Sequence, residues 1–146
     1  MRVLIDGDSF PNIEEIEKLC SKYNIELIVY IDTNHVLDLD YGKVNYVSSG
    51  DNAVDLVIEN IVKKDDIVLT GDYGVAIICL SKYAHVLDRN GYFYTNDTID
   101  YLVDLKEINR KTRKHSNIKG PKKRTKEDEN RLLENISKIM EEYYEK

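Results

Sequence analysis

The sequence predicts an α/β fold, a three-layer α/β/α sandwich with a mostly parallel central sheet. Short apolar runs that end at Asp or Gly are typical of buried strands, and they alternate with stretches whose apolar residues recur every three or four positions, as in amphipathic helices. Such alternation indicates a parallel sheet with helices on its faces. The chain has 146 residues, enough for one stable core, so we expect residues 1–146 to form a single domain.

The first third of the chain predicts three strands and one helix. Residues 3–5 form an apolar run that stops at a polar loop, and Pro11 suits the first turn of a helix that continues to about residue 23. Residues 25–31 and 44–47 predict the second and third strands, with a loop between them. The chain therefore begins with a βαβ unit.

The middle of the chain predicts a second crossover between parallel strands. Apolar residues recur at helical spacing from Asp51 to Val62, and Ser49 or Asp51 is placed to cap this helix. Residues 67–69 predict the next strand, and residues 75–80 the helix that follows it. Ligands of such sheets bind beyond the carboxyl ends of the strands, so the residues just after each strand are the first candidates for a site.

The next segment predicts a hairpin followed by a helix. Residues 85–87 form a strand, residues 88–91 carry a turn signal, and residues 92–95 alternate like the returning arm of a hairpin. Asn96 or Asp97 then caps a helix that runs towards the basic part of the chain.

A basic segment and an amphipathic helix make up the C-terminal part. Residues 106–126 contain ten Lys or Arg and one acid, although the whole chain has a net charge of −6. Such a block is either a solvated connector or a contact for phosphate groups. Thr125 and Asp128 form a capping box that predicts a helix over residues 126–145, which packs on the domain or on a second copy in a homodimer.

Composition argues against several classes of protein. No window approaches the ~20 apolar residues of a membrane span, and the N-terminal apolar run is too short for a signal peptide, so we expect a cytoplasmic protein without a membrane partner. Cys20 and Cys79 have no CxxC partner and are predicted to be buried thiols. His35, His85 and His115 have no Cys or His at zinc-ligand spacing, so a zinc site is not expected.

Four aspartates are candidates for a shared site. Asp6 and Asp8 follow the first strand, Asp72 follows the strand over residues 67–69, and Asp55 lies on the helix between them. Carboxylates held close together raise one another's pKa unless a cation neutralises them. Mg or Mn, as one or two ions, prefers oxygen ligands and suits this all-aspartate set.

An ion in this position indicates hydrolysis of a phosphate ester, because it polarises the ester and lowers the pKa of an attacking water. The alternative is that each acid has a local role. Asp6 and Asp8 then stabilise turns, Asp51 and Asp72 cap helices, and Asp55 faces solvent.

Five segments of the chain, in order, resemble the blocks of the bacterial YaiI/YqxD family, which is uncharacterised in activity and is grouped with PIN-like domains. The segments are IDGDSFP (5–11), SGDNAVDLVI (49–58), LTGDYGVA (69–76), DRNGYFYT (88–95) and GPKKRTKED (120–128). The resemblance covers nearly the whole chain and implies a PIN-like α/β/α domain with an acidic metal site. Many PIN-like proteins are Mg- or Mn-dependent ribonucleases. Carried over by position, the acids of that site fall on Asp6, Asp8, Asp55 and Asp72.

The chain departs from the family pattern at three places. Asn52 stands where the family usually has an acid, with Asp51 beside it as a substitute. The turn over residues 88–91 reads Asp-Arg-Asn-Gly in place of the usual Asn-Pro-Arg-Gly. Lys123 and Arg124 replace the usual Pro and Phe after the Gly-Pro pair.

The leading hypothesis is a metal-dependent nuclease acting on RNA, in which the four aspartates are both metal ligands and catalytic residues. Supporting residues that orient ligands or water are Ser9, Asp51, Asn52 and Thr70. The basic residues expected to bind nucleic acid are Arg89, Lys111, Arg113, Lys114, Lys122, Lys123 and Arg124.

Two alternatives stay open. One is an RNA-binding or regulatory module of the same fold that has lost efficient catalysis, for which Asn52 is the motivating feature. The other is a haloacid-dehalogenase-like phosphatase, because Asp6-Gly7-Asp8 resembles its Asp-x-Asp pair. Against it, Ser9 stands where that family favours Thr or Val, and no second acid pair follows Asp72.

Overall fold

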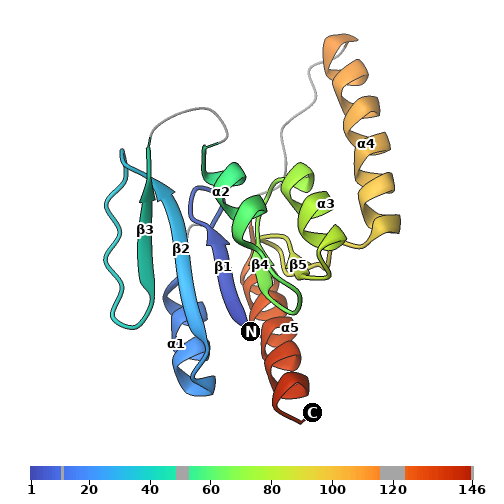
Figure 1. Ribbon diagram of the computed structural model, residues 1–146. Helices are drawn as coiled ribbons and strands as arrows, with labels where there is room; N and C mark the ends of the chain where they lie inside the picture. The colour runs from blue at the N-terminus through green and yellow to red at the C-terminus, as the bar shows by residue number, and fades with distance from the viewer. Residues whose placement is uncertain (11, 49–52, 116–123, 146) are drawn as a thin grey trace.

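The computed structural model describes the backbone of residues 1–10, 12–48, 53–115 and 124–145. Its centre is a parallel sheet in the order β3-β2-β1-β4-β5 (Figure 1). The strands are β1 (Arg2–Asp6), β2 (Glu26–Asp32), β3 (Lys43–Val47), β4 (Ile67–Leu69) and β5 (His85–Leu87). In this register Ile5 of β1 lies opposite Val29 of β2 and Leu69 of β4, so β1 and β4 end within one residue of each other, and β2 continues two residues further.

Helices cover both faces of the sheet and complete a three-layer α/β/α sandwich (Figure 1). They are α1 (Glu14–Tyr23), α2 (Ala53–Ile61), α3 (Tyr73–Ser81), α4 (Asn96–His115) and α5 (Lys126–Glu145). α1 and α5 pack against one face, and α2 and α3 against the other. The predicted α/β fold class with a mostly parallel sheet is confirmed.

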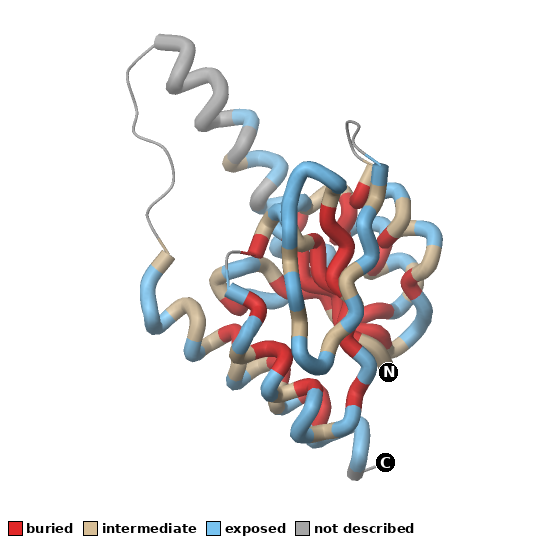
Figure 2. The backbone as a smooth tube through the Cα atoms, turned by 90° about the vertical axis from the view of Figure 1, so that its left-hand side faces the viewer, coloured by how far each residue is buried: buried red, intermediate tan, exposed pale blue. Residues whose placement is uncertain are grey.

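Two apolar cores follow from this layering. Val3 and Ile5 of β1 point into the core beneath α1 and α5, whereas Leu4 points into the core beneath α2 and α3. A strand covered on both faces needs consecutive apolar residues rather than alternation, which is why the run at residues 3–5 has no polar member. Figure 2 shows the buried residues concentrated in the sheet and on the inner sides of the helices.

The two cysteines lie one in each core and are buried free thiols, as predicted. Burial, with a contribution from a nearby glutamate in each case, raises the pKa of Cys20 and of Cys79 to about 12. Both therefore stay protonated and behave as small apolar residues. No helix in the part of the chain that the structure describes has the length and apolar character needed to cross a membrane.

The capping residue predicted for α5 is confirmed, whereas the one predicted for α4 is not. Thr125 and Asp128 exchange the expected bonds, since Asp128 N donates to Thr125 Oγ1 (3.2 Å) and Thr125 N donates to Asp128 Oδ2 (3.0 Å). The prediction that Asn96 or Asp97 caps α4 is wrong. Thr98 N donates to Thr95 Oγ1 (3.1 Å), so Thr95 is the capping residue.

The expected returning arm of a hairpin after β5 is reduced to one isolated bridge between Leu87 and Phe93. The chain then turns away into α4, and Tyr94 N donates to Val86 O (2.9 Å). Residues 92–95 therefore do not form the predicted strand. Their role is to bring the buried Tyr94 side chain under the sheet edge, where it meets Thr70.

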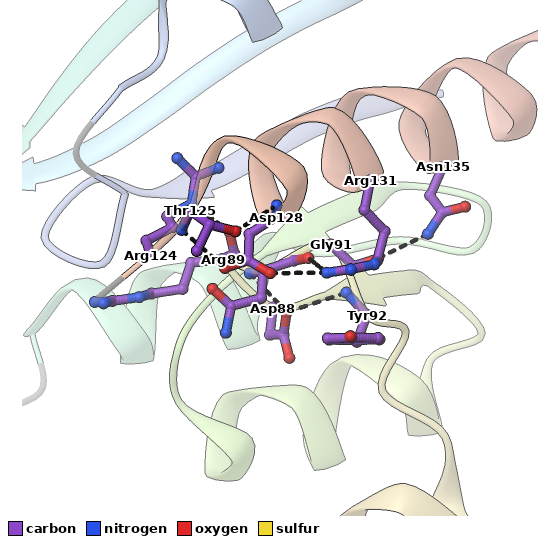
Figure 3. A network of polar contacts seen from close by, with 10 residues as sticks. Asp88, Arg89, Gly91, Tyr92, Arg124, Thr125, Asp128, Arg131 and Asn135 are labelled. Atoms are coloured by element: carbon purple, nitrogen blue, oxygen red, sulfur yellow. Dashed lines mark hydrogen bonds and ion pairs between the residues drawn. The ribbon is translucent and has the colours of Figure 1, made fainter. Parts of the chain in front are cut away.

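Side chains of α5 bind the backbone of the turn over residues 88–91 (Figure 3). Arg131 Nη1 donates to Asn90 O (3.0 Å), and Asn135 Nδ2 donates to Gly91 O (2.7 Å). Arg124 Nε donates to Arg89 O (2.7 Å), just before α5 begins. Because carbonyl oxygens make these contacts, the altered side chains of this turn and the Arg at position 124 are compatible with docking of α5.

Candidate functional site

The strand order reverses between β1 and β4. From β1 the chain passes through α1 on one face to β2, and it reaches β4 through α2 on the opposite face. Two crossovers that diverge in this way leave a crevice at the carboxyl ends of the neighbouring strands, the usual ligand position in open α/β sheets. Asp6 ends β1 and Thr70 follows β4 at this point. We refer to Asp6, Asp55 and Asp72 as the candidate acid site.

Asp6 is a buried carboxylate, only 5% exposed, whose two oxygens are both hydrogen-bonded. Oδ2 accepts the Ser9 hydroxyl (2.8 Å) and the Thr70 hydroxyl (3.4 Å), and Oδ1 accepts the Asp8 backbone N–H (3.2 Å). Burial raises the pKa of Asp6, while the bonds from Ser9 and the Asp8 amide act in the opposite direction. These donors fix the orientation of the carboxylate.

Thr70 connects Asp6 with Asp72. Its side chain is fully buried, and the hydroxyl that donates to Asp6 also accepts the backbone N–H of Asp72 (3.1 Å). Its carbonyl oxygen accepts the phenol O–H of Tyr94 (3.3 Å). One side chain therefore sets both the direction of the Asp6 carboxylate and the path of the chain at Asp72.

Asp72 has the local role that the sequence allows, because it caps α3. Gly74 N donates to Asp72 Oδ1 (2.7 Å), and Val75 N lies 3.4 Å from the same oxygen. Both capping bonds end on Oδ1, so capping does not occupy Oδ2. The residue thus has a structural function that is compatible with a second one at the sheet edge.

Asp55 of α2 faces the other two acids. Its pKa is raised to about 6, first by burial, then by the negative charges of Asp72 and Asp6, and further by a hydrogen bond with Asp72. A shift of this origin requires carboxylates that share one region of low polarity. The structure therefore brings together three of the four predicted aspartates, from β1, α2 and the loop after β4.

Asp8 points towards a different group. Its Oδ1 lies 3.6 Å from His35 Nδ1, which in turn lies 2.9 Å from Asp32 Oδ1. The ligand atoms of Asp8, Asp32 and His35 all lie within 4.8 Å of one another, and among the described residues no other three acidic, histidine or cysteine side chains lie so close. The carboxylate oxygens of the candidate acid site therefore do not all lie within 4.8 Å of one another. The hydrogen bond from His35 lowers the pKa of Asp32, with a further contribution from the backbone of Asn34.

Asp32 and His35 were missed by the sequence reasoning. Asp32 is the last residue of β2, so the same strand-end criterion that selects Asp6 and Asp72 applies to it. The spacing criterion for zinc ligands passed over His35, because its neighbours Asp8 and Asp32 are acids.

The remaining predicted residues are only partly described. Ser9 donates to Asp6, as stated above, and Arg89 is exposed beside Arg124 at the turn that α5 binds. Asp51, Asn52, Lys122 and Lys123 lie outside the described residues, as do Ser49 and Pro11, and the side chains of Lys111, Arg113 and Lys114 are not described.

Comparison with known proteins gives a consistent result over the whole chain. The model of a family described as "Uncharacterized BCR, YaiI/YqxD family" matches residues 4–142. A UPF0178 protein of Clostridium tetani is 44% identical over 137 residues, which cover 93% of this chain and 94% of the relative. A UPF0178 protein of Clostridium kluyveri is 43% identical over 96% of this chain and 93% of its own length. That of Clostridium novyi is 40% identical over 100% of this chain and 99% of its own length. No solved structure matches the chain significantly.

Proposed function

The chain belongs to the YaiI/YqxD family, and from this premise and the candidate acid site we propose that it is a metal-dependent nuclease that hydrolyses RNA. The observation that carries the proposal is the convergence of three acids at the carboxyl edge of the sheet, where the Thr70 hydroxyl links Asp6 to the backbone of Asp72. Burial and the charges of Asp72 and Asp6, which raise the pKa of Asp55 to about 6, agree with this convergence. Folding has gathered acids that repel one another at a ligand-binding edge of the sheet, and a cation removes that repulsion.

The donor set fits a hard divalent ion. All three side chains offer carboxylate oxygens, which Mg²⁺ and Mn²⁺ prefer over the nitrogen and sulfur ligands of zinc. Their oxygens are more widely spaced than those of the group formed by Asp8, Asp32 and His35. Such spacing suits an ion that keeps several of its waters and touches only one or two carboxylates directly.

In this proposal each residue of the candidate acid site has its own role in metal binding. Asp6, fixed by Ser9 and Thr70, and Asp72, fixed by its capping bonds, hold the ion, and Asp55 completes the negative charge from α2. When bound, Mg²⁺ or Mn²⁺ supplies Lewis-acid polarisation of the phosphodiester and lowers the pKa of a water. Asp8 is directed towards His35, so it acts beside this group rather than within it.

Two further features support a nucleic acid as substrate. The blocks that resemble the YaiI/YqxD family, which is grouped with PIN-like domains, contain all three acids. Arg89 and Arg124 lie together after β5, whose carboxyl end belongs to the same edge of the sheet as Asp6. Arg89 is exposed and Arg124 is half-buried, and arginines next to an acidic metal site suit the phosphates that flank a scissile bond.

Calorimetric titration with Mn²⁺ tests the metal site. Wild type and the Asp100→Asn control, changed on the exposed surface of α4, are expected to give the same binding heat, and Asp6→Asn/Asp72→Asn is expected to lose it. Equal heats in all three proteins would overturn the site. Cleavage of a fluorogenic single-stranded RNA with Mn²⁺ then tests the activity, which Asp55→Asn is expected to reduce by at least about tenfold.

The same assays separate the alternatives. RNA binding without cleavage under saturating Mn²⁺ would favour the regulatory module. Release of phosphate from a small phosphomonoester would favour the haloacid-dehalogenase-like phosphatase. Against that chemistry, both oxygens of Asp6 accept hydrogen bonds and the side chain is buried, so it is poorly exposed for nucleophilic attack.

A further inference from the structure

A cleft of about 460 Å³ lies between the start of α1 and the loop of residues 33–42. This loop faces the viewer in Figure 2. Phe10, Ile13 and Ile31 line it from the body of the domain, and Val36 and Leu37 line it from the loop. Polar and apolar residues line the cleft in similar proportion. Apolar walls with polar groups that fix orientation are typical of sites for small organic ligands and rings.

The loop that forms one wall is fixed in place, although it has no helix or strand. Glu17 is a buried carboxylate, 8% exposed, and its Oε2 accepts the backbone N–H groups of Tyr41 (2.7 Å) and Gly42 (2.8 Å). Tyr46 Oη donates to Leu37 O (3.1 Å) and accepts Leu37 N–H (3.1 Å). Compact loops of this length are frequently functional.

One apolar side chain on this fixed loop is left in water. Val36 is 95% exposed and lines the cleft, whereas Leu37 next to it packs partly against the core. Since the backbone on both sides is held by hydrogen bonds, Val36 stays at the mouth of the cleft. Its side chain is therefore available to an apolar group that enters the cleft.

The charges of the cleft exclude phosphate as its occupant. Among the lining residues that the structure describes, four are acids and none is Lys or Arg. Glu17 is engaged with the loop, which leaves Glu14, Asp38 and Asp40. Ionised carboxylates only accept hydrogen bonds, so the cleft suits a flat or apolar group whose edge presents N–H donors.

The cleft opens next to the candidate acid site. Gly7, between Asp6 and Asp8, is one of its lining residues, and so is His35, whose Nδ1 lies 3.6 Å from Asp8 Oδ1. The segment that follows β1 is therefore common to the acid site and to the cleft.

We propose that this cleft receives one unstacked base of a single-stranded nucleic acid and selects guanine, which rests on the proposed function of the neighbouring site. Guanine offers two adjacent donors, N1–H and N2–H₂, that match the two oxygens of a carboxylate at the rim. Uracil offers one N–H between two carbonyl groups, which the same carboxylates repel. Proteins read single-stranded RNA in this way, through base edges and apolar contacts.

Nucleosides without phosphate, in metal-free buffer, test the cleft apart from the acid site. In a calorimetric or NMR titration, guanosine is expected to bind about tenfold more tightly than uridine, as one good pair of hydrogen bonds provides. Asp38→Asn/Asp40→Asn, at two exposed rim positions, is expected to lose that preference, and Asp100→Asn on α4 to keep it. Unchanged melting temperatures confirm that all variants are folded.

The outcomes distinguish this inference from the nuclease proposal. RNA cleavage without base preference, unaffected by Asp38→Asn/Asp40→Asn, would overturn the cleft alone. Guanosine binding by a wild-type protein that cleaves no RNA in the presence of Mn²⁺ would keep the base site and overturn the nuclease. Binding of spermidine, with neither nucleoside bound, would show that the acidic rim serves a cation and would overturn the inference.

Discussion

The Thr70 hydroxyl lies 3.4 Å from Asp6 Oδ2 and accepts the backbone N–H of Asp72. A single buried side chain thus holds together the carboxyl ends of two neighbouring strands, β1 and β4. The acids of the candidate site owe their relative placement to this contact as much as to the strands themselves.

Thr70→Val is therefore expected to affect both stability and metal binding. It keeps the shape of the side chain but removes the acceptor of the partly buried Asp72 N–H, which costs about 1 kcal/mol of unfolding free energy. Loss of a group that orients a ligand weakens binding of Mn²⁺ by about tenfold. Urea unfolding and calorimetry measure the two effects, and Thr70→Ser, which keeps the hydroxyl, should recover the metal affinity. Full affinity in the Val variant would contradict the role of Thr70.

Tyr94→Phe removes the hydrogen bond to the Thr70 carbonyl and little else. The side chain is buried, so we expect a loss of about 1 kcal/mol of unfolding free energy. Tyr101→Phe, on the exposed surface of α4, is the matched control and should leave the stability unchanged. Equal denaturant midpoints for the two variants would show that the Tyr94 contact adds no stability.

The raised pKa of Asp55 sets the pH dependence of the metal-free protein. Its ordinary value is 3.8 and its folded value is about 6, so the folded state binds the proton more tightly than the unfolded state. The contribution of Asp55 to stability is therefore complete below pH 4 and is lost as the pH rises through 6. After allowance for solvent screening we expect about 1 kcal/mol.

The comparison with Asp55→Asn isolates this contribution. The variant should match wild type near pH 4 and exceed its unfolding free energy at pH 7, measured without metal in urea. Addition of Mn²⁺ at pH 7 should reverse the order, because only wild type gains the full binding energy. A variant less stable than wild type at pH 7 without metal would contradict the repulsion among the three acids.

Gly91→Ala is expected to detach α5 from the turn after β5. Gly91 has a φ of +86°, and an added Cβ would lie 2.3 Å from Leu132 N and 2.7 Å from Leu132 Cα. Backbone strain and a clash with helix backbone together cost more than about 2 kcal/mol. Asn135→Ala, which removes only one hydrogen bond to Gly91 O, should cost about 1 kcal/mol. Limited proteolysis near α5 should therefore be faster in Gly91→Ala than in Asn135→Ala, and faster in Asn135→Ala than in wild type.

Arg89 and Arg124 are expected to contribute to the salt dependence of RNA binding. Each phosphate contact adds about 0.7 to the slope of log K against log salt for a single strand, so Arg89→Gln/Arg124→Gln should flatten it by about 1.4. Lys18→Gln on α1, away from the sheet edge, should leave the slope unchanged. An unchanged slope in the double arginine variant would exclude these residues as phosphate contacts.

Sequence reasoning succeeded where the determining contacts are local. The β1 and β4 runs, Val3–Ile5 and Ile67–Leu69, must be apolar because both faces of the sheet are covered, so their strands were predicted correctly. The Thr125 and Asp128 capping box lies within one helical turn and was also correct. At α4 the cap was misassigned by one or two residues, because Thr95, Asn96 and Asp97 are all competent caps and the packing of Tyr94 decides among them.

By itself the sequence determined the fold class and the family of this protein, and it selected three acids that the structure then places together. Those features depend on the order of apolar and polar residues along the chain. Tertiary structure alone decided that Asp8 turns towards His35 and Asp32, that Thr70 joins Asp6 to Asp72, and that a held loop closes an acidic cleft beside them. Side chains that share no local pattern meet only after the strand order 3-2-1-4-5 brings their strand ends into register.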